Sequence, residues 1–427
     1  MRKQWPAVSL CQNTGKFREK SMVFDYSKVC RPGLPPIEKR WLGFPKYNFI
    51  GGHNDGASVP TQDFVSAAAR VLDKEGSTLA TYSLESGPQG YLPLRDFLAN
   101  YLNKSTGMNE TADDIMLVSG SLQALDLVND VLLTKGDTVV IEEAAYQGAI
   151  QRIKRLGVRG IGAPLDADGI RMDSLSNILD DLKRDGVKPK YLYAVPTVQN
   201  PTGTVMPEAR RLEFLNLSRK FDVPIFEDDC YADLTFDGER PRAIRALDDD
   251  GRVIFCGTFS KTIAPALRVG YLVAEWEILS QMLAVKRDGG SGALEQMVLG
   301  EYCPTRFEEH VTKLRKVLKE KCEAMLDAIA AEFGTVADIQ KPKGGIFVWV
   351  QLPDSIDTMK LSEVAIEEGV AINPGAEWVA DPETGKSKMR LCFGNPTIEE
   401  IREGVAILAN ICHREFRLPK RGSNIRR

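Results

Sequence analysis

The feature that most constrains the fold is a regular alternation of short apolar segments and helical segments between residues 115 and 258. The apolar segments are IMLVSG, DTVVIEE, KYLYAVP, VPIFEDD and RVIFCGT, and each one ends in polar or small residues. Segments that are almost continuously apolar are typical of strands covered by helices on both sides. The sequence therefore predicts an α/β fold, with a mostly parallel sheet between two layers of helices.

The length of the chain favours more than one domain. Its 427 residues exceed the size at which a single hydrophobic core stops growing, about 250–300 residues. We expect an N-terminal arm over residues 1–60, which are rich in Pro, Gly and aromatic residues, and a large domain over residues 61–300. Beyond it, a long charged helix over Phe307–Phe333 and the apolar segments that follow indicate a smaller α+β domain, residues 301–427, joined by the arm.

Composition and charge argue against several classes of function. The formal net charge is 55 − 59 = −4, without the concentrated basic face that nucleic acid binding needs. No segment approaches the roughly 20 apolar residues that span a bilayer, and the N-terminus does not read as a signal peptide. The eight cysteines have no paired spacing and the three histidines lie far apart, so we expect a reduced, cytoplasmic protein without a metal site.

Polar side chains follow the apolar segments at the points where the expected strands end. In an α/β sheet, ligands bind outside the carboxyl ends of the strands, so these residues are candidates for a site. They are Ser119 to Leu122, Tyr146, Asn200, Asp228, Tyr231, Thr258, Ser260, Lys261 and Arg268. Each has an ordinary explanation on its own, since a lysine at a strand end is usually solvated and NPTG is a common turn.

Taken together, these residues match the requirements of pyridoxal phosphate chemistry. A lysine must bind the cofactor's aldehyde, and a carboxylate must keep the pyridine nitrogen protonated. Backbone amides at a helix start, hydroxyl groups and an arginine must hold the phosphate. The expected strand ends supply every one of these groups along one edge of one sheet.

At this point a family resemblance appears. The chain resembles the class I/II pyridoxal-phosphate-dependent aminotransferases of fold type I, and within them the aminoadipate and kynurenine aminotransferase branch. The matching motifs are YSLESGPQGYLPLR, SGSLQALDLV, PTVQNPTG, EDDCYADL, GTFSKTIAPALRVGY and MRLCFGN. They run from Tyr82 to Asn395 in the order that the family has, and the resemblance makes the large domain the one that binds the cofactor.

The resemblance implies roles for the residues that surround the cofactor ring. Lys261 would form the internal aldimine and then move the proton between Cα of the substrate and C4′ of the cofactor. Asp228 would pair with the pyridine N–H, and Tyr146 would stack on the ring. Tyr231 and Asn200 would donate to the phenolic oxygen.

It also implies how the phosphate is held. The backbone N–H groups of Ser121 and Leu122 and the Ser121 hydroxyl would bind it, together with Ser260 and Arg268. Thr258 would lie beside them. Leu122 stands where the family usually has glutamine, which removes a side-chain donor but keeps the backbone donor.

The resemblance also implies residues near the substrate and the partner subunit, three of them new and one, Asn200, already named. Arg390 would hold the α-carboxylate of the substrate in a two-point fork, Asn200 would lie beside it, and Gly52 would lie in a loop close to the substrate. Tyr82 would reach the phosphate in the neighbouring subunit, so the resemblance implies a homodimer with shared active sites.

The reaction that these residues favour is transamination. The amino group of an L-amino acid, with aminoadipate or aromatic donors favoured, would pass to a 2-oxo acid such as 2-oxoglutarate. Two alternatives stay open on the sequence. Pyridoxal-phosphate lyases, synthases and decarboxylases use the same scaffold, and some transcription regulators use an aminotransferase-like domain to sense an effector.

Overall fold

The computed structural model describes residues 24–34, 37, 40–41 and 43–419. The chain divides into two compact units, residues 1–44 and 45–427. The described part of the first unit contains one short 3-10 helix, η1 (Tyr26–Lys28), whose start is capped by the Asp25 side chain. Residues 1–23 of the expected arm, which include the N-terminal residues in which no signal peptide was recognised, lie outside the described residues.

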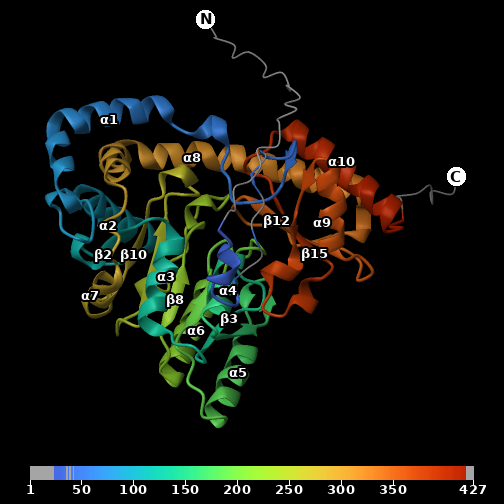
Figure 1. Cartoon of the computed structure of the whole chain (residues 1–427), viewed down its shortest axis with the longest axis horizontal. Helices are drawn as coiled ribbons and strands as arrows, with labels where there is room; N and C mark the ends of the chain where they lie inside the picture. The colour runs from blue at the N-terminus through green and yellow to red at the C-terminus, as the bar shows by residue number, and fades with distance from the viewer. Residues whose placement is uncertain (1–23, 35–36, 38–39, 42, 420–427) are drawn as a thin grey trace, which may run out of the picture. The chain divides into compact units, whose positions relative to one another are not determined.

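The second unit is built on a seven-stranded sheet with the order β2-β10-β9-β8-β7-β3-β4 (Figure 1). Its strands are β2 (Ile115–Val118), β3 (Thr138–Glu142), β4 (Arg159–Ala163), β7 (Leu192–Ala194), β8 (Ile225–Asp228), β9 (Val253–Thr258) and β10 (Gly270–Val273). The neighbours from β9 to β4 are parallel, whereas β10 runs antiparallel to both β2 and β9. The predicted α/β fold with a mostly parallel sheet is therefore confirmed.

Helices cover both faces of this sheet because successive strand residues point to opposite sides. In β2, Met116 and Val118 pack in the cluster that includes α3 (Ser121–Leu132). Ile115 and Leu117 instead pack in a second cluster with helices on the other face. That second cluster holds α1 (Thr61–Glu75), α2 (Leu92–Thr106) and part of α8 (Ala293–Glu332). The remaining helices around the sheet are α4 (Gln147–Arg155), α5 (Met172–Arg184), α6 (Glu208–Phe221) and α7 (Trp276–Val285).

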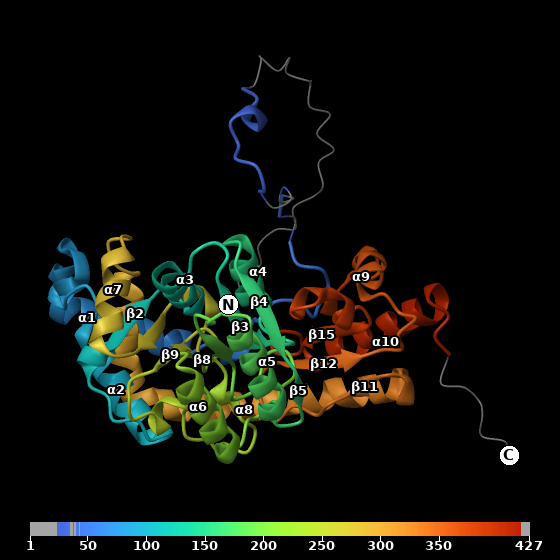
Figure 2. The same ribbon diagram turned by 90° about the horizontal axis from the view of Figure 1, so that it is seen from below.

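The longest element is α8, which runs from the region of α1 and α2 to the C-terminal elements in both views (Figures 1 and 2). The sequence predicted that this helix covers Phe307–Phe333. The structure corrects this start, since α8 is continuous through Pro304. Met297 and Tyr302 before the proline, and Phe307 after it, are buried in one cluster with α2, and this packing holds both halves in line.

The C-terminal elements form a four-stranded antiparallel sheet with the order β11-β12-β15-β14. Its strands are β11 (Asp338–Ile339), β12 (Phe347–Gln351), β14 (Asn373–Pro374) and β15 (Lys388–Cys392), and it packs with α9 (Thr358–Glu367) and α10 (Ile398–Glu415). A short strand, β1 (Tyr47–Asn48), pairs in parallel with β13 (Val370–Ala371). Two short strands, β5 (Leu165–Asp166) and β6 (Gly169–Ile170), form a separate hairpin. The three-part division at residues 60 and 300 stays a prediction, and α8 crosses the second of these boundaries.

The sequence predicted no apolar segment long enough to span a bilayer. Within the described ranges, no helix combines the length and the apolar character needed to cross a bilayer.

Candidate active site

The carboxyl ends of the parallel strands open onto a cavity of about 220 Å³. Eleven of the thirteen residues that the sequence selected line it, which confirms that they come together in space. They are Gly52, Ser121, Leu122, Tyr146, Asn200, Asp228, Tyr231, Ser260, Lys261, Arg268 and Arg390. The sequence did not select several other lining residues: Gly51, Gln147, Val195, Cys230, Pro265, Asn373 and Trp378.

The two selected residues that do not line the cavity lie in different places. Thr258 is buried behind it, where its Oγ1 lies 3.0 Å from Ser260 Oγ and accepts a hydrogen bond from the Ser260 N–H. Thr258 therefore orients Ser260. Tyr82 lies in a separate cavity of about 400 Å³ and is 88 % exposed, so in a single chain it contributes nothing to the lysine site.

Lys261 follows β9 by three residues and points across the cavity. Its Nζ donates to the carbonyl oxygen of Gly52 at 3.0 Å. Burial lowers the pKa of the Lys261 amine, and the positive charges of Arg390 and Arg268 lower it further. The neutral, nucleophilic form of this amine is therefore populated closer to neutral pH than in a solvated lysine.

A mutation at Gly52 tests how closely the loop approaches Lys261. A Cβ at position 52 would lie 2.5 Å from Lys261 Nζ, and Gly52 itself has no left-handed backbone angle. Gly52→Ala is expected to displace the amine and lower kcat/KM by about 100-fold, because small misplacements of a reacting group cost that much. The melting temperature should change little, since only the tip of a flexible side chain moves.

The matched control for this variant is Gly56→Ala in the same segment, where an added Cβ meets nothing within 4 Å. It should keep wild-type kcat/KM. Equal activity of both alanine variants would show that Gly52 does not limit the position of Lys261.

Asp228 closes β8 and is 7 % exposed. Its Oδ2 accepts a hydrogen bond from Tyr193 Oη at 2.7 Å, and its Oδ1 accepts one from Cys230 Sγ at 2.7 Å. Burial raises the pKa of Asp228, and the neighbouring Asp229 carboxylate adds to the rise, whereas the Cys230 and Tyr193 hydrogen bonds lower the pKa. Tyr193 carries no signal in the sequence that links it to Asp228, because only the pairing of β7 with β8 brings the two together.

Arg390 lies on β15 and is almost fully buried at the cavity wall. Its Nη1 donates to Asn200 Oδ1 at 3.1 Å, and its Nη2 donates to the carbonyl oxygen of Gly51. The guanidinium carbon lies 3.8 Å from the ring centroid of Trp378. Among the residues that the structure describes, no carboxylate pairs with this guanidinium, and its Nε has no hydrogen-bond partner.

A buried guanidinium without a carboxylate is costly unless a ligand supplies the negative charge. Burial accordingly lowers the pKa of Arg390 from its ordinary value. The arrangement is therefore ready for an anionic group of a ligand. Trp378 was missed because its position in η10 (Gly375–Trp378) carries no signal in the sequence that links it to Arg390.

The start of α3 provides a second place for an anion. Gly120 precedes the helix at φ 79°, and no side chain caps the first amides. Arg268 donates from Nη2 to the Ser119 carbonyl oxygen at 2.8 Å, and a Cβ on Gly120 would overlap with this same nitrogen. Free amides, the Ser121 and Ser260 hydroxyls and a guanidinium thus surround one end of the cavity, which suits a phosphate group.

Tyr146 and Tyr231 supply the aromatic groups of the cavity. The Tyr146 ring lies 6.1 Å from the Trp378 ring, with the planes tilted by 49°. Asn200 Nδ2 donates to Tyr231 Oη at 3.3 Å. Burial raises the pKa of Tyr231 well above its usual value, so its hydroxyl keeps its proton and can itself donate.

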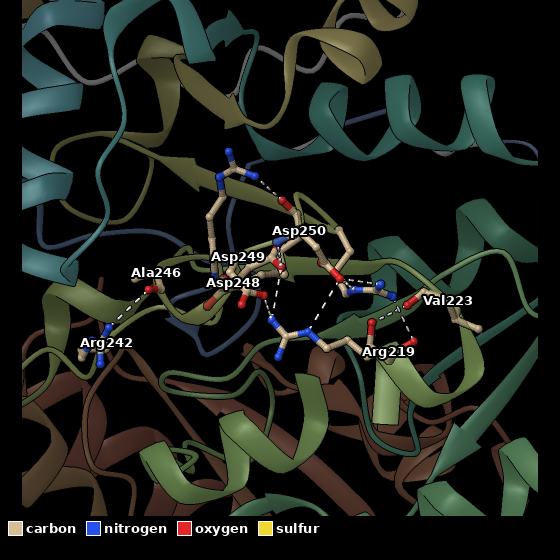
Figure 3. A network of polar contacts seen from close by, with 12 residues as sticks. Arg219, Val223, Arg242, Ala246, Asp248, Asp249 and Asp250 are labelled. Atoms are coloured by element: carbon tan, nitrogen blue, oxygen red, sulfur yellow. Dashed lines mark hydrogen bonds and ion pairs between the residues drawn. The ribbon is translucent and has the colours of Figure 1, made fainter. Parts of the chain in front are cut away.

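A group of three carboxylates lies outside the cavity, at Asp248, Asp249 and Asp250 (Figure 3). These oxygens are close enough to one another to hold a metal ion. Arginines already pair with them, because Arg219 lies close to all three and Arg252 Nη2 lies 2.7 Å from Asp250. None of these residues lines the cavity, so they take no part in its chemistry.

Comparison with known proteins decides the family. The sequence profile of Aminotransferase class I and II matches residues 47–408. The chain belongs to this family. It is a pyridoxal-phosphate-dependent aminotransferase of fold type I.

Three relatives illustrate how far the similarity extends. Aromatic-amino-acid aminotransferase 1 of Thermococcus litoralis is 34 % identical over 373 residues, which cover 87 % of this chain and 88 % of that protein. The structure of the kynurenine aminotransferase of Pyrococcus horikoshii, solved with PMP, has a TM-score of 0.81 at 36 % identity and covers 86 % of this chain and 91 % of that one. The α-aminoadipate aminotransferase LysN of Thermus thermophilus, solved with N-(5′-phosphopyridoxyl)-L-leucine, has a TM-score of 0.80 at 33 % identity and covers 87 % and 93 %.

The cavity of this aminotransferase fits the cofactor of its family. Gly120 leaves room for Arg268 at the phosphate end, and Asp228 offers a buried carboxylate at the inner end. Lys261 points into the space between them. The residues present therefore supply each type of group that pyridoxal phosphate requires.

Proposed function

We propose that this aminotransferase takes its amino group from an aromatic amino acid or from 2-aminoadipate and passes it to a 2-oxo acid such as 2-oxoglutarate. The observation that carries the proposal is the buried Arg390 guanidinium, which has no carboxylate partner in the described chain and shares a cavity with the Lys261 amine. The names of the similar proteins, which include aromatic, kynurenine and α-aminoadipate aminotransferases, support these donors. The rings of Trp378 and Tyr146 in the same cavity suit an apolar or aromatic side chain.

The residues at the strand ends would hold the cofactor. Ser121, Leu122, Ser260 and Arg268 would bind its phosphate, with Thr258 fixing the Ser260 hydroxyl. When bound, pyridoxal phosphate supplies an electron-accepting ring that makes the Cα–H bond of an attached amino acid acidic.

Around the ring, four side chains would set its position and charge. Asp228 would accept a hydrogen bond from the pyridine nitrogen, and Tyr146 would pack on the ring face. Asn200 and Tyr231 would donate to the phenolic oxygen. Asp228, Asn200 and Tyr231 are buried, which excludes water and strengthens their interactions.

Lys261 and Arg390 would act on the substrate. Arg390 would bind the α-carboxylate through two parallel N–H donors, which fixes the amino acid in one orientation. Lys261 Nζ would then take the proton from Cα. The lowered pKa of the Lys261 amine supports this role, because a base must be unprotonated at the working pH. Gly52 would keep the loop above the amine free of side-chain atoms.

The experiment that tests this function uses the cofactor-loaded protein and a panel of single L-amino acids without any acceptor. We expect one equivalent of pyridoxamine phosphate and the matching 2-oxo acid, identified by mass spectrometry, with phenylalanine, tyrosine, kynurenine or 2-aminoadipate reacting fastest. Release of carbon dioxide, ammonia or a side-chain fragment, without pyridoxamine phosphate, would contradict transamination. A preference for short aliphatic donors would contradict the proposed substrates alone.

We further propose that the protein is a homodimer in which Tyr82 reaches the phosphate site of the partner subunit. Tyr82 is almost fully exposed, and the exposed Leu79 lines the same surface cavity. Val65 and Leu72 of α1 and Trp276 of α7 are further exposed apolar residues. Exposed apolar groups of this kind favour a protein interface. The seven cysteines of the described chain are free thiols, which supports a reducing compartment such as the cytoplasm.

Mixing two inactive variants tests the shared site. Lys261→Ala and Tyr82→Ala dimers are each expected to be defective, but a mixed dimer contains one site with both residues intact. After exchange of subunits in equal amounts, half of the dimers are mixed, so about one quarter of the wild-type number of sites should return. Native mass spectrometry of one variant with a mass tag shows whether mixed dimers have formed, and no recovery in a mixture that contains them would rule out a contribution of Tyr82 across the interface.

A further inference from the structure

Both oxygens of Asp228 are already bonded by side chains of this chain. Tyr193 Oη donates to Oδ2, and Cys230 Sγ donates to Oδ1, each at 2.7 Å. All three side chains are buried, and Cys230 also lines the cavity. A carboxylate oxygen has two lone pairs, so each oxygen can still accept one further hydrogen bond.

The surrounding strands fix both donors. Tyr193 lies on β7, beside β8, and its ring stacks on Phe226 of β8 at 5.7 Å with the planes 20° apart. Its hydroxyl therefore cannot turn away from Asp228. Cys230 follows Asp228 by two residues, next to β9, whose Cys256 pairs with Asp228 in the sheet register.

Both donors keep their hydrogen atoms. Burial raises the pKa of Tyr193 well above its usual value, and the Asp228 charge adds to this. Contact with the Cys256 thiol, together with burial, raises the pKa of Cys230 well above that of a free thiol. Asp228 is therefore the acceptor in both hydrogen bonds. These bonds favour its charged form, in opposition to burial and to the neighbouring Asp229.

We propose that Tyr193 and Cys230 are positioning residues that keep Asp228 charged and correctly aimed, and so strengthen its hydrogen bond to the protonated ring nitrogen of the cofactor. This inference rests on the proposed role of Asp228. It goes beyond that role because it assigns part of the strength of the Asp228 contact to two neighbouring side chains. Cys230 is a weak donor and Tyr193 a stronger one, so their contributions should differ.

The test measures the Kd of pyridoxamine phosphate by equilibrium dialysis. This form of the cofactor is held without a bond to Lys261, so its affinity reports the non-covalent contacts. Tyr193→Phe is expected to raise the Kd about tenfold, because the loss of one hydrogen bond to a charged group typically weakens an interaction by about this factor or more. Cys230→Ala should raise it about threefold, and Cys230→Ser, which keeps a donor, should restore the wild-type Kd or lower it.

Two buried residues of the same types serve as controls. Tyr191 lies two residues before Tyr193, and its hydroxyl donates to Asn129 Oδ1 and not to Asp228. Tyr191→Phe removes this hydroxyl. Cys322→Ala removes a buried thiol from α8. Both should keep the wild-type Kd, and an equal loss in Tyr191→Phe and Tyr193→Phe would show strand damage and overturn the inference. If Tyr193→Phe fails to fold, the comparison of Cys230→Ala with Cys230→Ser decides.

A cofactor analogue separates this inference from the proposed function. 1-Deazapyridoxamine phosphate has a carbon in place of the ring nitrogen, so Tyr193→Phe should bind it as well as the wild type or better. An equal loss for the analogue and the natural cofactor would overturn the inference. Asp228→Asn is the reference: if it leaves the Kd of pyridoxamine phosphate unchanged, the role of Asp228 itself fails. If it raises the Kd while the Tyr193 and Cys230 variants do not, the positioning pair alone fails.

Discussion

Replacing Lys261 with alanine is expected to lower the rate of the amino-acid half-reaction by about 10⁴-fold or more, because the variant loses both the group that binds the cofactor covalently and the base at Cα. The fold should persist. Within the described part of the chain the Lys261 amine has one hydrogen bond, to the Gly52 carbonyl oxygen, and the substitution takes a partly buried amine out of the cavity. Single-turnover kinetics with an aromatic donor measures the loss.

Two further measurements show whether Lys261 is the covalent anchor. Borohydride reduction followed by mass spectrometry should place the cofactor on the peptide that contains Lys261 in the wild type and on no peptide in the variant. Thermal unfolding should give melting temperatures within a few degrees of each other. A variant that still carried covalently attached cofactor after dialysis would assign the bond to another lysine.

Replacing Arg390 with lysine is expected to raise KM for the amino donor about 10- to 100-fold, with a smaller effect on kcat. A lysine carries a positive charge but has no planar pair of parallel donors for the α-carboxylate. It would also leave the Asn200 side-chain oxygen and the Gly51 carbonyl oxygen without their present donor, and lose the stacking on Trp378. Steady-state kinetics at several donor concentrations separates KM from kcat.

Arg152→Lys is the control for the arginine chemistry. Arg152 lies on α4 and pairs with Asp126, and it does not line the cavity. Its replacement should leave KM unchanged. An unchanged KM in Arg390→Lys as well would mean that another group binds the α-carboxylate.

The sequence by itself determined the mostly parallel sheet and most of the residues that line the cavity at its edge. Continuous apolar segments can be buried only between helices, and parallel strands bring their carboxyl ends to one edge. Residues at the end of a strand, such as Asp228, or in the loop that follows one, such as Lys261 and Asn200, therefore come together at that edge. For this reason nine of the thirteen selected residues line one cavity, whereas Gly52 and Arg390, which also line it, were selected only from the family resemblance.

Only the tertiary structure decided which residues support those at the strand ends. Tyr193 reaches Asp228 because β7 pairs with β8, and a shift of one residue along the strand would turn its ring to the other face. Trp378 contacts Arg390 because η10 packs against β15, a strand of the four-stranded C-terminal sheet. Such contacts join segments that lie far apart in the sequence. Strand pairing and side-chain packing bring these segments together, and a single sequence carries no local signal for either.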